Sequence, residues 1–144
     1  MTKVGIFDIA TPAVLFQKLQ HDFQRVSAAP GDRFAAIDFF GTAWSLVDWI
    51  SSHEHRQVAS CPLLEVCREL ANNSKHGVLR YTQVKHAKVD GGGFQFPGFD
   101  PAVFDVGHLV IELTGEAERQ HGHEVRVEVF AARVVEFWRK ELGL

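Results

Sequence analysis

A long stretch between residues 33 and 55 carries apolar side chains at helical spacing on almost every side. Its apolar positions are Phe34, Ile37, Phe39, Phe40, Ala43, Trp44, Leu46, Val47, Trp49 and Ile50. A helix that is apolar all round has to be covered by other elements. With Asp32 as its N-terminal cap, the stretch therefore predicts a central, buried helix at about 33–55.

Three other segments show one apolar face at helical spacing, together with start or stop signals. Thr11 followed by Pro12 is typical of a helix start, and Gly77 is typical of a left-handed helix end. The predicted helices cover residues 12–27, 61–76 and 129–142. With the central helix they predict an up-and-down four-helix bundle.

Between the third and fourth helices, at about 78–128, the apolar period changes toward two. Asp90 and the glycines at 91–93 supply turn chemistry, and Thr114–Gly122 is expected to be a polar loop. The predicted strands cover residues 78–89, 94–96, 108–113 and 123–128. The expected fold class is thus mainly α (α+β), with a small antiparallel sheet inserted between the third and fourth helices.

Length and composition indicate one domain spanning residues 1–144, since 46% of the side chains are hydrophobic. The net charge of −3 excludes a basic domain that coats nucleic acid through bulk charge, so any contact with RNA has to be local. No apolar run is long enough to span a membrane, and Asp8 interrupts any leader-like stretch. We therefore expect a soluble, cytoplasmic protein without membrane contact.

Cysteine and histidine positions do not indicate a metal or another cofactor, and none is predicted. Cys61 and Cys67 point about 240° apart on a helix and are interpreted as small core residues. Two His-x-His pairs, at 53–55 and 121–123, have no cysteine at ligand spacing. The phenylalanines between 94 and 104 either close the end of the bundle, stack on bases or contact another subunit.

A polar strip crosses the otherwise apolar central helix. Its members follow spacings of three and four, and they are Asp38, Thr42, Ser45, Asp48 and Ser52. The strip either meets water or faces a functional site.

A second polar row lies late in the third helix, where Arg68, Asn72 and His76 follow one another at intervals of four within about 80°. Arginine can hold two phosphate oxygens, and histidine can move a proton near neutral pH. The combination suits a phosphodiester without a metal. Alternatively the row is a solvated face, on which Arg68 pairs with Glu65 or Asp48.

The run from Cys67 to His76, Cys-Arg-Glu-Leu-Ala-Asn-Asn-Ser-Lys-His, resembles the HEPN (higher eukaryotes and prokaryotes nucleotide-binding) superfamily. The resemblance covers about residues 10–77 and, more weakly, the last helix. It implies a helical bundle that binds RNA. Many members are metal-independent endoribonucleases of toxin–antitoxin, abortive-infection or CRISPR systems.

Carried over to this chain, the resemblance makes Arg68 the phosphate-binding arginine and His76 the catalytic histidine. Asp48, or else Asp38, would support the arginine, with Asn72 and Lys75 beside it. Seven residues separate Arg68 from His76, so their Cα atoms lie about 12 Å apart on a regular helix. To share one phosphate they need a bend in the last turn or donation across a homodimer.

RNA, a second copy of the chain and a protein partner such as an antitoxin are the expected partners. The alternative hypothesis is a non-enzymatic interaction module in which the HEPN-like bundle is retained and the catalytic motif has decayed. The long spacer and the absence of a basic surface favour this alternative.

Overall fold

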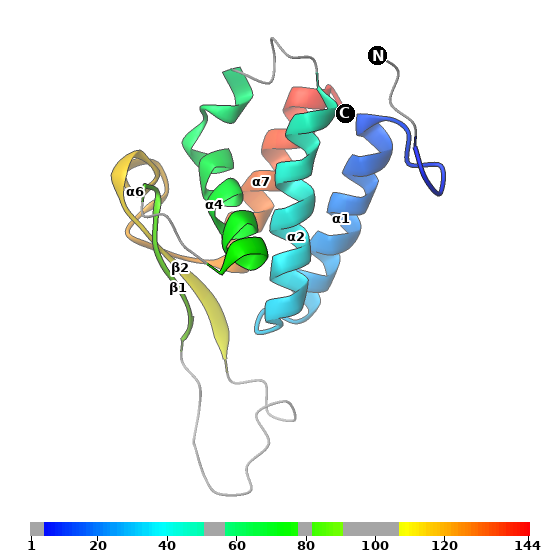
Figure 1. Ribbon diagram of the computed structural model, residues 1–144. Coiled ribbons are helices and arrows are strands. Elements are labelled where there is room, and N and C mark those ends of the chain that lie inside the picture. The colour runs from blue at the N-terminus through cyan, green and yellow to red at the C-terminus, as the bar shows by residue number, and fades with distance from the viewer. Residues whose placement is uncertain (1–4, 51–56, 78–81, 91–106) are drawn as a thin grey trace, which may run out of the picture.

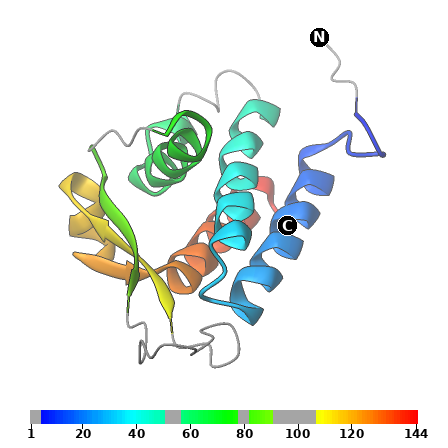
Figure 2. The same ribbon diagram turned by 60° about the horizontal axis from the view of Figure 1, so that its bottom comes forward.

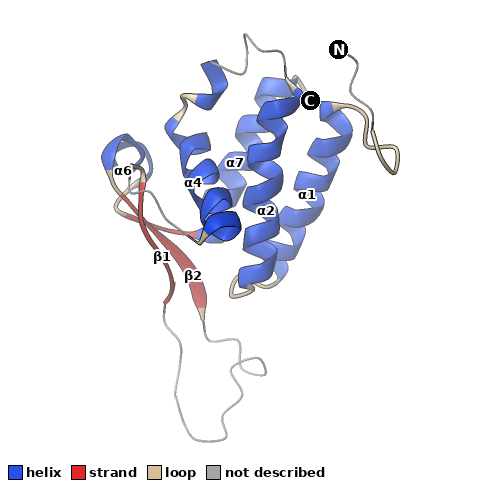
Figure 3. Ribbon diagram, viewed as in Figure 1, coloured by secondary structure: helices blue, strands red, loops and turns tan. Residues whose placement is uncertain are grey.

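The computed structural model describes residues 5–50, 57–77, 82–90 and 107–144. This part of the chain is mainly helical, with a small three-stranded antiparallel sheet (Figure 3). The helices are α1 (Pro12–Ala28), α2 (Arg33–Ser45), the 3₁₀ helix η1 (Leu46–Trp49), α4 (Pro62–His76), α6 (Gly115–His121) and α7 (Val127–Leu142). The strands are β1 (Val84–Asp90), β2 (His108–Leu113) and β3 (Glu124–Arg126).

Local signals account for where the first two helices begin. The Thr11 side chain accepts a hydrogen bond from the backbone N–H of Val14, and Pro12 occupies the first turn of α1. Asp32 accepts hydrogen bonds from the N–H groups of Phe34 and Ala35 and so caps α2. The bounds of α1 and the start of α2 thus agree with the sequence prediction.

The predicted extent of the central helix, about 33–55, is wrong. The α-helix ends at Ser45, a 3₁₀ turn follows to Trp49, and Ile50 is extended. Leu46 and Val47, the first two residues of the 3₁₀ turn, are both buried in the core. Residues 51–55 lie outside the described part.

α2 lies between α1 and α4, and α7 packs against both α1 and α2 (Figure 1). Side chains from all four helices meet in one buried cluster, in which Leu19, Phe39, Leu64 and Trp138 are almost completely inaccessible. The Phe40 and Phe130 rings, with centroids 6.3 Å apart, join α2 to α7. Trp138 is buried, whereas Trp44 and Trp49, two of the apolar positions of the predicted central helix, are only half-buried against the core.

The sheet has the order β1-β2-β3 and lies beside α4 and α7, on the side away from α1 (Figure 2). β1 pairs with β2 in a register that places Ala87 opposite Ile111 and Val89 opposite Leu109. The expected strand at 108–113 is confirmed. The expected turn at 91–93, the strand at 94–96 and the phenylalanines between 94 and 104 lie outside the described residues.

The prediction of a polar loop at Thr114–Gly122 is wrong, because α6 occupies Gly115–His121. Only Ala117 of this helix is buried, so no apolar period marks it in the sequence. A residue outside the helix stabilises its first turn, because the Ala117 N–H donates a hydrogen bond to the side-chain oxygen of Gln83 at 2.8 Å. α7 then begins at Val127, two residues earlier than expected.

Buried side chains of the sheet, including Val84 and Ile111, belong to the same cluster as those of the helices. The assignment of one domain to residues 1–144 stays a prediction. Within the described ranges, no helix combines the length and apolarity that crossing a membrane requires.

Candidate functional site

The last three turns of α4 carry the polar row predicted from the sequence. Pro62 occupies the first turn of the helix, and Gly77 ends it in the left-handed conformation with φ of 70°. Leu63, Val66 and Cys67 bury the opposite side of the helix, and Leu64, one turn before Arg68 on the row itself, is buried as well. α4 packs against α2. Packing of α4 against the core therefore fixes the position of the polar row.

Arg68 and Asn72 are half-buried, whereas Lys75 and His76 are exposed in the last turn. Among the described residues, the Arg68 guanidinium has no ion pair or hydrogen bond, and the Asn72 amide has none either. α4 is α-helical without interruption to His76. Regular helix geometry over this stretch places the Cα atoms of Arg68 and His76 about 12 Å apart, at 1.5 Å per residue.

Two carboxylates border this row, and other groups already occupy both. Glu69 is 2% exposed and accepts hydrogen bonds from the backbone N–H groups of Thr82 (2.9 Å), Gln83 (3.1 Å) and Val84 (2.9 Å), and from the Thr82 hydroxyl. Glu65 accepts from the Gln83 side-chain amide at 3.0 Å. Neither carboxylate forms an ion pair with Arg68, which keeps its charge available for an anion.

The two aspartates expected to support Arg68 do not contact it. Asp38 is exposed and pairs with Arg25 of α1 at 2.8 Å, which raises the pKa of that guanidinium. Asp48 is exposed on η1, with no ion pair to a described residue. The structure thus brings Arg68, Asn72 and His76 onto one face and leaves Asp38 elsewhere.

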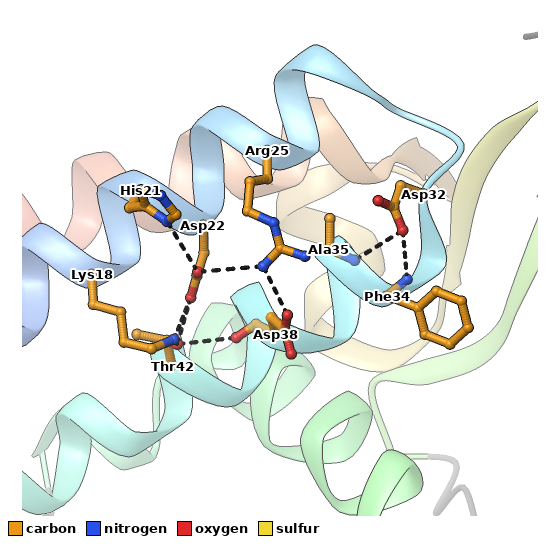
Figure 4. Close-up of polar contacts among 9 residues, drawn as sticks. All are labelled: Lys18, His21, Asp22, Arg25, Asp32, Phe34, Ala35, Asp38 and Thr42. Atoms are coloured by element: carbon orange, nitrogen blue, oxygen red, sulfur yellow. Dashed lines mark hydrogen bonds and ion pairs between the residues drawn. The ribbon is translucent and has the colours of Figure 1, made fainter.

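The polar strip of α2 faces α1 through a network that sequence reasoning missed (Figure 4). Its centre is Asp22, only 3% exposed, whose Oδ2 accepts from Lys18 Nζ and from the Thr42 hydroxyl, each at 2.7 Å. Lys18 also donates to the Thr42 oxygen at 2.7 Å. Arg25 lies 3.9 Å from the other Asp22 oxygen.

Two cations and two carboxylates balance in this network, since Lys18 and Arg25 face Asp22 and Asp38. Because these contacts join α1 to α2, we assign the network to the packing of the two helices. The spacing Lys18, Asp22, Arg25 on the polar flank of α1, opposite Thr42 of α2, is the signal that could have revealed it.

The described histidines and cysteines do not assemble a metal site. His121 packs edge-on against Phe130 with centroids 5.3 Å apart, while His123 lies 3.0 Å from Glu118. In residues 5–50, 57–77, 82–90 and 107–144, no three potential ligands gather. His53 and His55 lie outside these ranges. Burial raises the pKa of the Cys67 thiol, which suits a core residue.

The arrangement on α4 can bind an anion through a permanently charged fork, with an amide one turn away and a titratable ring two turns away. In comparisons with known proteins, no family model, curated sequence or solved structure matches this chain.

Proposed function

We propose that the chain is an HEPN-like RNA-binding protein, in which Arg68, Asn72 and His76 bind the phosphate backbone. The observation that carries this proposal is that Arg68 has no partner among the described residues and shares one face of α4 with Asn72 and His76. The carboxylates beside it, Glu65 and Glu69, are occupied by other partners. An RNA phosphate would supply the missing counter-charge.

The same proposal interprets α1, α2, α4 and α7 as an up-and-down four-helix bundle. Contacts of α2 with α1 and α4, and of α7 with α1, support this arrangement. The sheet inserted between α4 and α7 is then an addition to the bundle, with its start fastened to α4 by Glu69.

We propose further that cleavage takes place in a homodimer. Because α4 is helical to His76 and so separates the two groups within one protomer, Arg68 of one protomer would meet His76 of the partner subunit at one phosphodiester. The imidazole would take the proton of a ribose 2′-hydroxyl, whose oxygen attacks the phosphorus and displaces the 5′-oxygen. Arg68 would stabilise the charge on the phosphoryl oxygens, and the leaving oxygen would take up a proton. No metal takes part in this route.

Fluorescence anisotropy with single-stranded RNA over a range of salt concentrations tests the binding step. We expect Arg68→Ala to weaken binding about tenfold and to reduce the slope of log K against log salt by about 0.7, as for one lost phosphate contact on a single strand. Arg119→Ala removes an exposed arginine of α6 and serves as the matched control. Equal effects of the two substitutions would contradict the assignment.

The second candidate function is a non-enzymatic interaction module, favoured by the uninterrupted helix that holds Arg68 and His76 apart. The two functions differ in a cleavage assay performed in chelator. If wild type cleaves RNA and both Arg68→Ala and His76→Ala abolish cleavage while remaining folded, the nuclease is supported. If wild type neither binds nor cleaves RNA, the module is supported.

A further inference from the structure

A cavity of about 260 Å³ lies between α2, α4 and the inner face of β1 and β2. Its walls are mostly apolar and include Ala36, Ile37, Phe40, Leu70, Val89 and Leu109. Phe40 and Leu109 are buried, whereas Ile37 and Val89 are 45% and 60% exposed and thus mark the opening. An apolar cavity of about 150 Å³ is enough to hold benzene, so this one has room for a single ring with a short substituent.

Four polar side chains belong to the lining, and two of them are already occupied. The Ser74 hydroxyl donates to the Ala71 carbonyl oxygen at 2.8 Å, and Lys88 Nζ donates to Glu112 at 2.8 Å. The other two are Arg33 and Asn73. Neither side chain has a hydrogen bond or ion pair among the described residues, although the Arg33 guanidinium lies over the Phe34 ring.

The charge at the cavity is therefore one uncompensated cation. No aspartate or glutamate of the described chain is part of the lining. A guanidinium and a carboxamide both donate hydrogen bonds, and the planar guanidinium fork matches a carboxylate. The apolar walls complement the body of such a ligand, and the two donors complement its anionic end.

We propose that this cavity binds a small aromatic carboxylate, with the ring against Phe40 and the carboxylate at Arg33 and Asn73. This site is separate from the proposed RNA surface. Leu70, which lines the cavity, and Arg68 are two residues apart and so point about 200° apart around α4. Loss of RNA binding and loss of carboxylate binding are thus expected from different substitutions.

The test titrates the full chain with benzoate, and with benzyl alcohol as an uncharged probe of similar size. Calorimetry measures affinity, and amide chemical shifts of the wild type locate the site without any variant. Ala87→Phe fills the opening from β1, because Ala87 is exposed and lines the cavity. His86→Phe adds the same ring to a neighbouring position that lines a different hollow, with Glu112 and Thr114, and is the matched control.

We expect benzoate to bind wild type and His86→Phe with millimolar or better affinity and to shift the Val89 and Leu109 amides. Ala87→Phe should abolish binding, and Arg33→Gln should weaken it about tenfold. Absence of benzoate binding to folded wild type would overturn the proposal. So would equal affinity for benzyl alcohol, or chemical shifts elsewhere. If the wild type binds no benzoate but self-associates, and Ala87→Phe makes it monomeric, the cavity belongs to a contact between subunits and the proposal is overturned.

Discussion

Replacing Glu69 by glutamine tests whether one buried carboxylate fastens the sheet to the helices. The amide is nearly isosteric, but it presents one acceptor and one donor group where the carboxylate presents two acceptors. The backbone N–H groups of Thr82, Gln83 and Val84 all donate to Glu69. If the amide nitrogen takes the place of Oε2, the Val84 N–H loses its partner and the Gln83 N–H keeps only the longer bond of 3.2 Å to Oε1.

Hydrogen bonds to a charged group contribute about 1.5–3 kcal/mol each, and an unsatisfied buried donor costs about 1–3 kcal/mol. One lost bond and one weakened bond therefore predict a decrease of about 2–4 kcal/mol in the free energy of unfolding. That is a large part of the roughly 5–15 kcal/mol typical of a domain. Urea titration followed by circular dichroism measures the change. An unchanged m-value would show that the substitution alters the free energy of unfolding and not the surface exposed on unfolding.

Glu65→Gln is the matched control on the same helix face. Glu65 is half-buried and accepts one hydrogen bond from the Gln83 side chain, so the expected loss is below about 1 kcal/mol. The reasoning would be refuted if Glu69→Gln changed the unfolding free energy by no more than Glu65→Gln does.

Three further predictions concern groups outside the proposed sites. Asp22→Ala should lower the free energy of unfolding by about 2–3 kcal/mol, because the α1–α2 network loses its buried acceptor. Asp38→Ala removes an exposed ion pair and should lower it by less than about 1 kcal/mol. Urea titration measures both changes. Burial raises the pKa of the Cys67 thiol, so thiol alkylation should modify Cys61 roughly a thousandfold faster than Cys67. Mass spectrometry measures the two rates, and equal rates would contradict the burial of Cys67. Burial and Arg133 lower the pKa of His121, so stability should fall as pH drops below about 6.5, and His121→Gln should flatten that decline.

The direction of the pH dependence at His121 follows from proton binding. Below the unfolded-state pKa of about 6.5 the unfolded chain binds a proton that the folded ring resists, so acid favours unfolding until the pH passes below the folded-state pKa. Urea titrations at several pH values measure this slope. An identical slope in wild type and His121→Gln would show that the ring does not contribute to it.

Sequence signals were sufficient where structure is decided within one or two turns. The start of α1 at Pro12, the capping of α2 by Asp32 and the end of α4 at Gly77 each depend on a side chain or a glycine at the helix terminus itself. The shared face of Arg68, Asn72 and His76 likewise follows from helix geometry alone.

Features that depend on distant partners were not predictable in this way. α2 ends at Ser45 although the apolar pattern continues through Leu46 and Val47, and α6 forms although Ala117 is its one buried residue. The side chain of Glu69 lies next to the Arg68 row in sequence, yet it is buried beneath the start of β1. Its role could be recognised only once residues 82–84 were placed beside α4.

Asp38 illustrates the same limit for the candidate site. Asp38 lies on the polar strip of α2 as predicted, but that strip faces α1, where the Asp38 carboxylate forms an ion pair with Arg25. A helical pattern identifies which residues share a face, whereas the neighbour of that face is decided by tertiary packing.

The proposed nuclease requires Arg68 and His76 to act on one phosphate from two protomers. Mixing Arg68→Ala with His76→Ala, under conditions that exchange subunits, tests it most directly. Half of the dimers in an equal mixture combine the two variants, and each of these holds one intact site of two. Cleavage is therefore expected at about a quarter of the wild-type rate. A mixture as inactive as its separate components, beside a wild type that cleaves, would contradict it.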